Sequence, residues 1–122
     1  QVLKSKIFTD GFFQKKSEYI IKKKINSNFV ALTQSCTDAL EMAANLIQLK
    51  PNDEVIMPSY TFTSTANAVV LKGAKPVFAD INSNDLQIND ENIESLITKK
   101  TRAIFVVHYG GNCMNLEKIT LR

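Results

Sequence analysis

The sequence predicts an α/β fold in which a mostly parallel sheet carries helices on both faces. Short apolar runs alternate with segments of helical periodicity along almost the whole chain. The apolar runs are unbroken, as in strands that helices cover on both sides. Strands and helices that alternate in this way form parallel sheets with right-handed crossovers.

Composition excludes several other classes of protein. The 122 residues are 44% hydrophobic and 22% charged, which is typical of a soluble globular chain. No apolar run is long enough for a membrane span, and no signal peptide is visible. The chain lacks an initiator Met, so we expect the protein to begin upstream. The net charge is only +3, and Lys22–Lys24 has no interleaved aromatic residues, so no nucleic-acid partner is expected. Two distant cysteines, Cys36 and Cys113, and one His predict reduced thiols in a cytoplasmic protein and no metal site.

The first third of the chain predicts a helix, a strand and a second helix. Residues 12–25 place apolar side chains among lysines, as in an amphipathic helix. Phe29–Leu32 is expected to form a short buried strand. A second helix then opens near Ser35, which is followed by Asp38 in an approximate capping box. Because that helix is apolar over most of its circumference up to Ile47, we expect it to be buried on a sheet.

The middle of the chain predicts a strand, a helix and another strand. Residues 50–53 have the chemistry of a turn, and Val55–Met57 reads as a strand that ends at Pro58. A helix is expected over about residues 62–71, with Gly73 as its C-cap and Pro76 preventing its continuation. The next predicted strand is Val77–Ala79, which ends at Asp80.

The last third predicts a loop, a short helix and a final strand. Residues 82–90 are polar, with Leu86 and Ile88 as the expected anchors. A short helix with one apolar face follows, and Ala103–Val107 is expected to be a strand. Residues 115–122 are expected to begin a further helix. A parallel sheet that stopped there would leave an unpaired edge, so the sequence predicts an incomplete domain.

Three predicted strand ends carry residues suited to ligand binding, since ligands gather at the carboxyl ends of strands in open α/β sheets. These segments are Ser35–Asp38, Pro58–Phe62 and His108–Gly111. At the first, free backbone N–H groups and the helix dipole would suit a phosphate dianion, and Ser35 and Thr37 add hydroxyls. An ordinary helix N-cap explains the same residues. Neither G-x-G-x-x-G nor G-x-x-x-x-G-K-[ST] occurs, which argues against classical dinucleotide and ATP sites.

Other residues at these strand ends have two readings each. Cys36 at a helix start and His108 at a strand end could form a nucleophilic pair. The simpler interpretation is a small buried thiol and a hydrogen-bonded structural histidine or site-wall residue. Phe62 could stack on a planar ligand or belong to the core.

Six segments, in this order and spacing, resemble the DegT/DnrJ/EryC1/StrS family of sugar aminotransferases, which depend on pyridoxal 5'-phosphate (PLP). The segments are Ser35–Ala44, Pro51–Phe62, Ser64–Ala68, Gly73–Ile81, Thr101–Ile104 and Val107–Gly111. Within the family, the dTDP-4-amino-4,6-dideoxygalactose transaminases are the most similar group. The resemblance extends from about Asp10 to Ile119.

The resemblance implies that residues 1–122 are the N-terminal part of the large, cofactor-binding domain of the fold type I, or aspartate-aminotransferase, fold. It implies a homodimer that transfers an amino group from glutamate to a dTDP-linked 4-keto-6-deoxyhexose in surface-polysaccharide biosynthesis, such as that of O-antigen. By position, backbone amides around Cys36, Thr37 and Asp38 would hold the PLP phosphate. Phe62 would pack against the pyridine ring, and residues 10–12 would lie near the sugar.

Two parts of the family pattern are absent. The Schiff-base lysine and the Asp that pairs with the pyridine nitrogen lie further along in relatives, so we expect both beyond Arg122. Lys99 and Lys100 lie in a polar connection with no feature of that lysine. Because transamination needs both groups, the isolated chain is expected to be inactive.

Two alternatives remain open at this point. In a PLP-fold sugar dehydratase, a His replaces the catalytic lysine at a position outside these residues. A non-catalytic α/β module would instead bind a phosphorylated ligand, or a partner through the exposed sheet edge.

Overall fold

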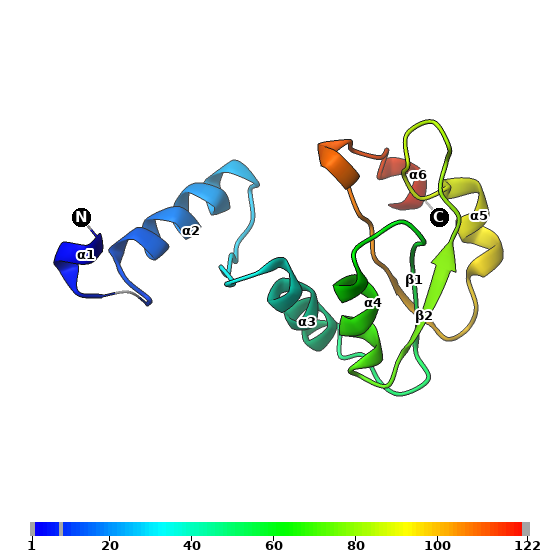
Figure 1. Ribbon diagram of the computed structural model, residues 1–122, viewed down its shortest axis with the longest axis horizontal. Helices are drawn as coiled ribbons and strands as arrows, with labels where there is room; N and C mark the ends of the chain where they lie inside the picture. Colours follow the sequence, from blue (N-terminus) through cyan, green and yellow to red (C-terminus); the bar gives the residue numbers. More distant parts are fainter. Residues whose placement is uncertain (1, 8, 121–122) are drawn as a thin grey trace. The chain divides into compact units, whose positions relative to one another are not determined.

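The computed structural model describes residues 2–7 and 9–120 and divides into two compact units, Gln1–Ala39 and Leu40–Arg122 (Figure 1). The first unit contains α1 (Val2–Ser5), α2 (Phe12–Lys24) and the start of α3 (Cys36–Leu46). The second contains the rest of α3, three strands and the remaining helices. Within the described residues, no helix combines the length and the apolar character that crossing a bilayer requires.

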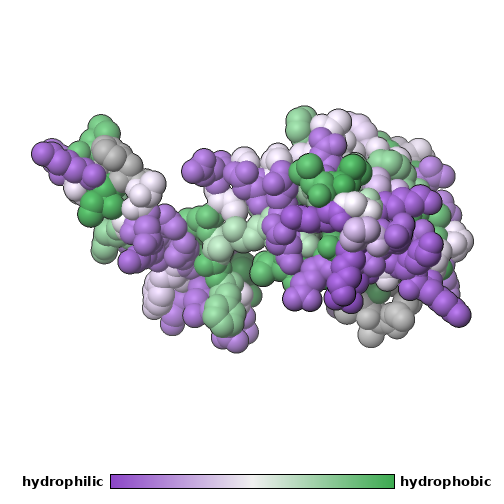
Figure 2. Space-filling view, turned by 90° about the horizontal axis from the view of Figure 1, so that it is seen from below, coloured by the Kyte–Doolittle hydropathy of each residue, from purple (hydrophilic) through white to green (hydrophobic). Residues whose placement is uncertain are grey.

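Helix α2 confirms the amphipathic helix predicted near residues 12–25. Its basic last turn, Lys22–Lys24, suits the negative end of the helix dipole, and Ile25 is the C-cap. No residue of α2 is buried: Phe12 is 70% and Ile20 54% exposed. Figure 2 accordingly shows hydrophobic side chains at the surface beside hydrophilic ones. The apolar residues of α2 therefore contribute no buried core among the described residues.

The strand predicted at Phe29–Leu32 is wrong, because this segment has no regular structure. Phe29 is 89% exposed rather than buried. The Ser27 hydroxyl donates to the Phe29 carbonyl at 2.7 Å and accepts from its amide at 3.3 Å. Local bonds of this kind compete with a β-ladder for the same backbone groups. In the described residues the sheet contains other segments only, so this apolar run has no strand to pair with.

Helix α3 confirms the second predicted helix and half of its capping box. The Asp38 amide donates to Ser35 Oγ at 3.1 Å, as an N-cap requires. The expected burial is wrong, because Ala44 is the only buried residue of this helix, and Leu46 is 76% exposed. A sheet covers only one stripe of a helix, so an apolar surface on every side needs further neighbours.

The second unit is built on a parallel sheet with the strand order β2-β1-β3. Its strands are β1 (Glu54–Pro58), β2 (Lys75–Ala79) and β3 (Thr101–Ile104). Helix α4 (Thr63–Val70) connects β1 to β2, and α5 (Asp90–Leu96) precedes β3. The C-cap of α4 is Leu71 rather than the predicted Gly73, which has φ +72° and ends the turn after the helix. Pro76 lies in β2, an edge strand of this sheet, where a missing N–H is tolerated.

Side chains of β1 alternate between two buried clusters, which confirms that helices cover both faces of the sheet. Val55 and Met57 pack with Ala44 of α3 and Val69 of α4. Ile56 packs in the other cluster with residues that include Ile93 of α5. All three β1 side chains are 0% exposed, so β1 is the centre of the core.

Strand β3 spans Thr101–Ile104, so it begins two residues and ends three residues before the predicted Ala103–Val107. The Phe105 amide still donates to the Ile56 carbonyl at 2.8 Å. In a parallel ladder the next bond would run from the amide of residue 58 to the Phe105 carbonyl. Residue 58 is a proline and has no N–H, so the ladder ends there.

The connection after β2 is a polar loop, as predicted, but only one of its two expected anchors is buried. Ile88 is 2% exposed and forms an isolated bridge with Ile81. Leu86 is 41% exposed and has φ +59°. This left-handed turn points Gln87 inward instead, and Gln87 is 2% exposed. Neither polar atom of its side chain has a hydrogen-bond partner in the described structure.

The substitution Gln87→Met is expected to stabilise the fold by about 1–2 kcal/mol. It removes a buried amide without partners, whose desolvation costs about 1–3 kcal/mol, and keeps an unbranched side chain of similar length. The measurement is urea unfolding of the wild type and the variant. Gln34→Met, at an exposed glutamine, is the control and should leave the unfolding midpoint unchanged. A loss of stability in Gln87→Met would show that the amide is satisfied in the protein in solution.

The end of the described chain contains a 3₁₀ turn (Tyr109–Gly111) and helix α6 (Glu117–Thr120). Helix α6 falls inside the predicted final helix, residues 115–122, of which residues 121–122 lie outside the described residues.

Candidate functional site

All three strands are parallel, so their carboxyl ends lie at one edge of the sheet. The segments that leave this edge start at Ser59 after β1, Asp80 after β2 and Phe105 after β3. Two of these connections contain the segments that the sequence predicted as ligand-binding, residues 58–62 after β1 and residues 108–111 after β3. The second unit therefore brings these two segments to the edge where α/β sheets bind ligands.

Phe62 lies at this edge as the N-cap of α4, with its carbonyl accepting from the Thr65 amide at 3.0 Å. Its side chain is 74% exposed. The Thr61 and Thr65 hydroxyls share a 2.8 Å hydrogen bond across the same turn. A core role for Phe62 is thus wrong for this unit, and its ring is open to a planar ligand.

Tyr60 and Tyr109 form a contact that the sequence analysis missed. Their ring centroids are 4.3 Å apart with an interplanar angle of 35°. Tyr60 follows β1 and Tyr109 follows β3, so the contact joins two neighbouring strand ends. Hydrogen bonding to the Tyr109 side chain, and then the charge of that side chain, raise the pKa of Tyr60 above the usual 10.0. The Tyr60 phenol therefore stays neutral to a higher pH than an isolated tyrosine.

Tyr109→Phe is expected to lower the pKa of Tyr60 back toward 10.0, because it removes the neighbouring hydroxyl. Tyr60 would then ionise at a lower pH than in the wild type. The measurement is a pH titration of ¹³Cζ-labelled tyrosine by NMR, with the Tyr60 signal assigned from Tyr60→Phe. Tyr19→Phe, at an exposed tyrosine of α2, should leave the Tyr60 titration unchanged. An unchanged titration in Tyr109→Phe would contradict the contact between the two hydroxyls.

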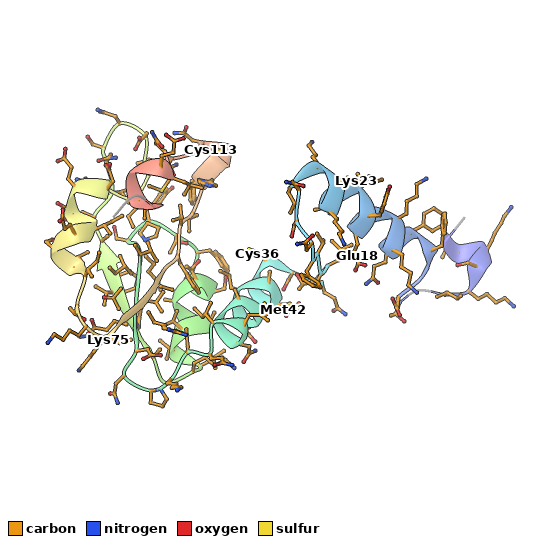
Figure 3. All side chains as sticks on the ribbon, turned by 180° about the vertical axis from the view of Figure 1, so that it is seen from behind. Glu18, Lys23, Cys36, Met42, Lys75 and Cys113 are labelled. Carbon is orange, nitrogen blue, oxygen red and sulfur yellow. The ribbon has the colours of Figure 1, made fainter. Side chains whose placement is uncertain are left out.

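Cys36, Thr37 and Asp38 form the first turn of α3, in the chain's first unit. Figure 3 labels Cys36 at the start of this helix and Met42 further along it. The first N–H groups of a helix have no intrahelical acceptor, and the Asp38 amide is satisfied by Ser35 Oγ. The amides of Cys36 and Thr37 therefore remain for an anion. Phe62 belongs to the second unit, so the structure describes it separately from this turn.

Of the two readings of Cys36, the buried thiol is contradicted, and the pair with His108 stays untested because the two residues belong to different units. Cys36 is an exposed free thiol, so the expectation of a buried thiol is wrong. His108 Nδ1 accepts from the Met114 amide at 3.4 Å, which agrees with the structural role expected for this histidine.

A further pocket of about 180 Å³ opens between the segments that follow β2 and β3. Its lining includes Asp85, Gln87, Asp90 and the exposed thiol of Cys113. The two carboxylates make it unsuited to a phosphate group. No group of three His, Cys, Asp or Glu residues within the described ranges is arranged to hold a metal ion.

Five lysines of the second unit whose side chains the structure describes lie near the amino ends of the strands, at the opposite edge of the sheet. Lys99 and Lys100 come directly before β3. Lys75, which Figure 3 labels, is the first residue of β2. These positions are therefore separated from Phe62 by the length of a strand, about 13–17 Å for four or five residues. Among the lysine side chains described in this unit, the following are at the amino edge: Lys50, Lys72, Lys75, Lys99 and Lys100.

Comparisons of the sequence and of the structure with known proteins find similarity to the same kinds of protein. The model of the DegT/DnrJ/EryC1/StrS aminotransferase family matches residues 1–121. The Bacillus subtilis spore coat polysaccharide biosynthesis protein SpsC is 39% identical over 78% of this chain. The 3-oxo-glucose-6-phosphate:glutamate aminotransferase of the same organism is 34% identical over 98% of it. A crystal structure of GDP-4-keto-6-deoxymannose-3-dehydratase with a trapped PLP-glutamate geminal diamine superimposes with a TM-score of 0.89, at 32% identity over 98% of this chain.

The chain spans only part of each of these proteins. It covers 24% of SpsC, 27% of the 3-oxo-glucose-6-phosphate aminotransferase and 33% of the dehydratase chain. The fold described above is accordingly part of the fold of these larger enzymes.

Proposed function

Because the chain belongs to the DegT/DnrJ/EryC1/StrS aminotransferase family, we propose that it forms part of the cofactor-binding domain of a PLP-dependent sugar aminotransferase. The supporting observation is the first turn of α3, which offers the amides of Cys36 and Thr37 at the positive end of a helix. The segment matches the one to which the family resemblance assigns the cofactor phosphate.

Taken separately, the first unit offers residues suited to the phosphate, and the second offers an exposed aromatic ring suited to one face of the cofactor ring. Cys36 and Thr37 would donate their amides to the phosphate, and the Thr37 hydroxyl can add a further donor. The Asp38 amide already donates to Ser35 Oγ, so we propose that it contributes least of the three amides to phosphate binding. Phe62, exposed at the N-terminus of α4, would pack against the pyridine ring. When bound, PLP supplies the electron sink for proton movement at the amino-bearing carbon.

We propose that the group that moves this proton lies outside the 122 residues. The described lysine side chains of the second unit lie at the amino edge of the sheet, away from Phe62. We therefore propose that the catalytic lysine and the aspartate that pairs with the pyridine nitrogen come from another part of the protein, and that these residues alone are inactive.

The proposed reaction transfers the amino group of glutamate to a dTDP-linked 4-keto-6-deoxyhexose. Glutamate appears in the names of both the aminotransferase relative and the dehydratase complex, and the latter acts on a nucleotide-linked 4-keto-6-deoxy sugar. SpsC is named for polysaccharide biosynthesis, which supports a role in making a surface polysaccharide such as O-antigen. The enzyme is proposed to act as a cytoplasmic homodimer.

The test is an assay of the protein produced from the complete gene, incubated with PLP, glutamate and the dTDP-linked 4-keto-6-deoxyhexose. Mass spectrometry should detect an amino sugar nucleotide together with 2-oxoglutarate. Residues 1–122 expressed alone should give no product. If the complete protein forms no amino sugar from any nucleotide-linked keto sugar tested, a non-catalytic phosphate- or partner-binding module becomes the better account.

A sugar dehydratase is the second candidate, because a dehydratase chain is as similar to this chain as the aminotransferases are. Dehydration removes a hydroxyl from the sugar as water and leaves no nitrogen in the product. The same assay separates the two reactions by product mass. A deoxygenated sugar without added nitrogen would replace the aminotransferase proposal.

A further inference from the structure

We propose that Tyr60 and Tyr109, here called the tyrosine platform, bind the hexose ring of the amino acceptor. The inference rests on the proposed function and goes beyond it by naming the residues that contact the sugar. The two rings are 4.3 Å apart and come from the ends of adjacent strands, at the carboxyl edge of the sheet.

The tyrosine platform has the properties of a binding surface rather than of a core contact. Tyr60 is 41% and Tyr109 43% exposed, so the pair lies beside the two buried clusters and not within them. Aromatic faces contact the C–H groups of a pyranose ring, and the phenol hydroxyls can bond its hydroxyl groups. Tyrosine provides both kinds of contact with little loss of conformational freedom.

The position of Phe62 favours the hexose over the nucleobase as the occupant. Tyr60 and Phe62 are two residues apart, so their Cα atoms are separated by at most about 7 Å. Phe62 is the proposed neighbour of the cofactor ring, and the keto carbon must come close to that ring to react. The keto carbon belongs to the hexose, whereas a diphosphate separates the base from it. The part of the substrate nearest to Tyr60 is therefore the hexose.

One hydrogen bond links the side chains of the tyrosine platform, so one of its two hydroxyl protons remains for a ligand. A phenol with the usual pKa of 10.0 is already protonated at neutral pH, and hydrogen bonding to Tyr109 raises the pKa of Tyr60 further. A protonated phenol both donates to and accepts from a sugar hydroxyl. No cation–π contact to either ring is found among the described residues, so binding would depend on ring contact and neutral hydrogen bonds.

The experiment compares the wild type with Tyr60→Leu, Tyr109→Leu and the two corresponding Phe variants, each made in the protein from the complete gene. Three probes are used: the dTDP-linked 4-keto-6-deoxyhexose, dTDP alone, and glutamate, whose reaction is followed by the spectral change of the bound cofactor. The Leu variants should bind the sugar nucleotide about thirtyfold more weakly, and the Phe variants about threefold. Binding of dTDP and the glutamate reaction should be unchanged. Tyr19→Leu, at an exposed tyrosine of α2, is the control and should behave as the wild type.

The other outcomes separate the two proposals. Equal weakening of dTDP and of the sugar nucleotide would mean that the platform binds the base, and would overturn the inference. Unchanged sugar binding in the Leu variants, with glutamate still reacting, would overturn the inference and leave the proposed function standing. If the wild type neither reacts with glutamate nor binds the sugar nucleotide, the proposed function fails, and the inference fails with it.

Discussion

Replacing Thr37 by glutamate is expected to lower the affinity of the protein for PLP at least about 100-fold. Thr37 lies in the first turn of α3, where the proposed phosphate site is. Two like charges about 4 Å apart repel by about 4 kcal/mol at an effective dielectric constant of 20, and each 1.4 kcal/mol is a factor of ten in affinity. The affinity is measured by equilibrium dialysis of PLP against the protein from the complete gene.

The helix itself should tolerate Thr37→Glu, because a carboxylate in the first turn of a helix interacts favourably with its dipole. Asn45→Glu adds the same charge at an exposed position near the other end of α3 and serves as the matched control. It should change the PLP affinity by less than about threefold. Equal loss in both variants would indicate a general charge effect, and no loss in Thr37→Glu would place the phosphate elsewhere.

Ile56→Ala is expected to destabilise the fold by about 2–5 kcal/mol. Ile56 is 0% exposed at the centre of β1, the middle strand of the sheet, and packs with Ile88 and Ile93 from the loop and helix beyond β2. Removing its side chain leaves a cavity that the sheet and α5 cannot fill without moving. The free energy of unfolding is measured by urea denaturation.

Ile97→Ala is the control for this prediction. Ile97 is 50% exposed at the end of α5, so its truncation should cost less than about 1 kcal/mol. Similar losses in the two variants would contradict the assignment of the core to the two faces of β1.

The elements that the sequence predicted correctly are those specified by nearby residues. Ser35 accepts from the Asp38 amide three residues on, and Gly73 adopts the positive φ that ends the turn after α4. The apolar run at Val55–Met57 lies between turn residues and Pro58, and it forms the central strand. Capping, turn chemistry and an unbroken apolar run act over a few residues, so a single sequence reveals them.

The errors concern contacts between distant segments. Phe29–Leu32 has the composition of a strand, but a strand also needs a partner strand. The Ser27 hydroxyl instead forms hydrogen bonds with the amide and the carbonyl of Phe29. The predicted strand end at Val107 is wrong, because the ladder stops where Pro58 of β1 has no N–H to donate, and Pro58 is distant in the sequence. The all-round apolar character of α3 predicted burial, which depends on what surrounds the helix.

In the candidate site, too, features set by nearby residues could be predicted, and contacts between distant segments could not. The helix N-terminus at Cys36 and Thr37, where we propose the phosphate binds, could be inferred from local residues, because it is a property of one segment. The contact of Tyr60 with Tyr109 depends on the strand order, which puts β1 beside β3, and nothing in either segment alone indicates it.

The most direct measurement is to locate the lysine that holds the cofactor. The protein from the complete gene is loaded with PLP, reduced with borohydride to fix the cofactor to its lysine, digested and mapped by mass spectrometry. The label is expected on one lysine outside residues 1–122. A label on Lys99, Lys100 or another lysine of these 122 residues would contradict the proposal that this chain holds the phosphate while the catalytic lysine lies elsewhere.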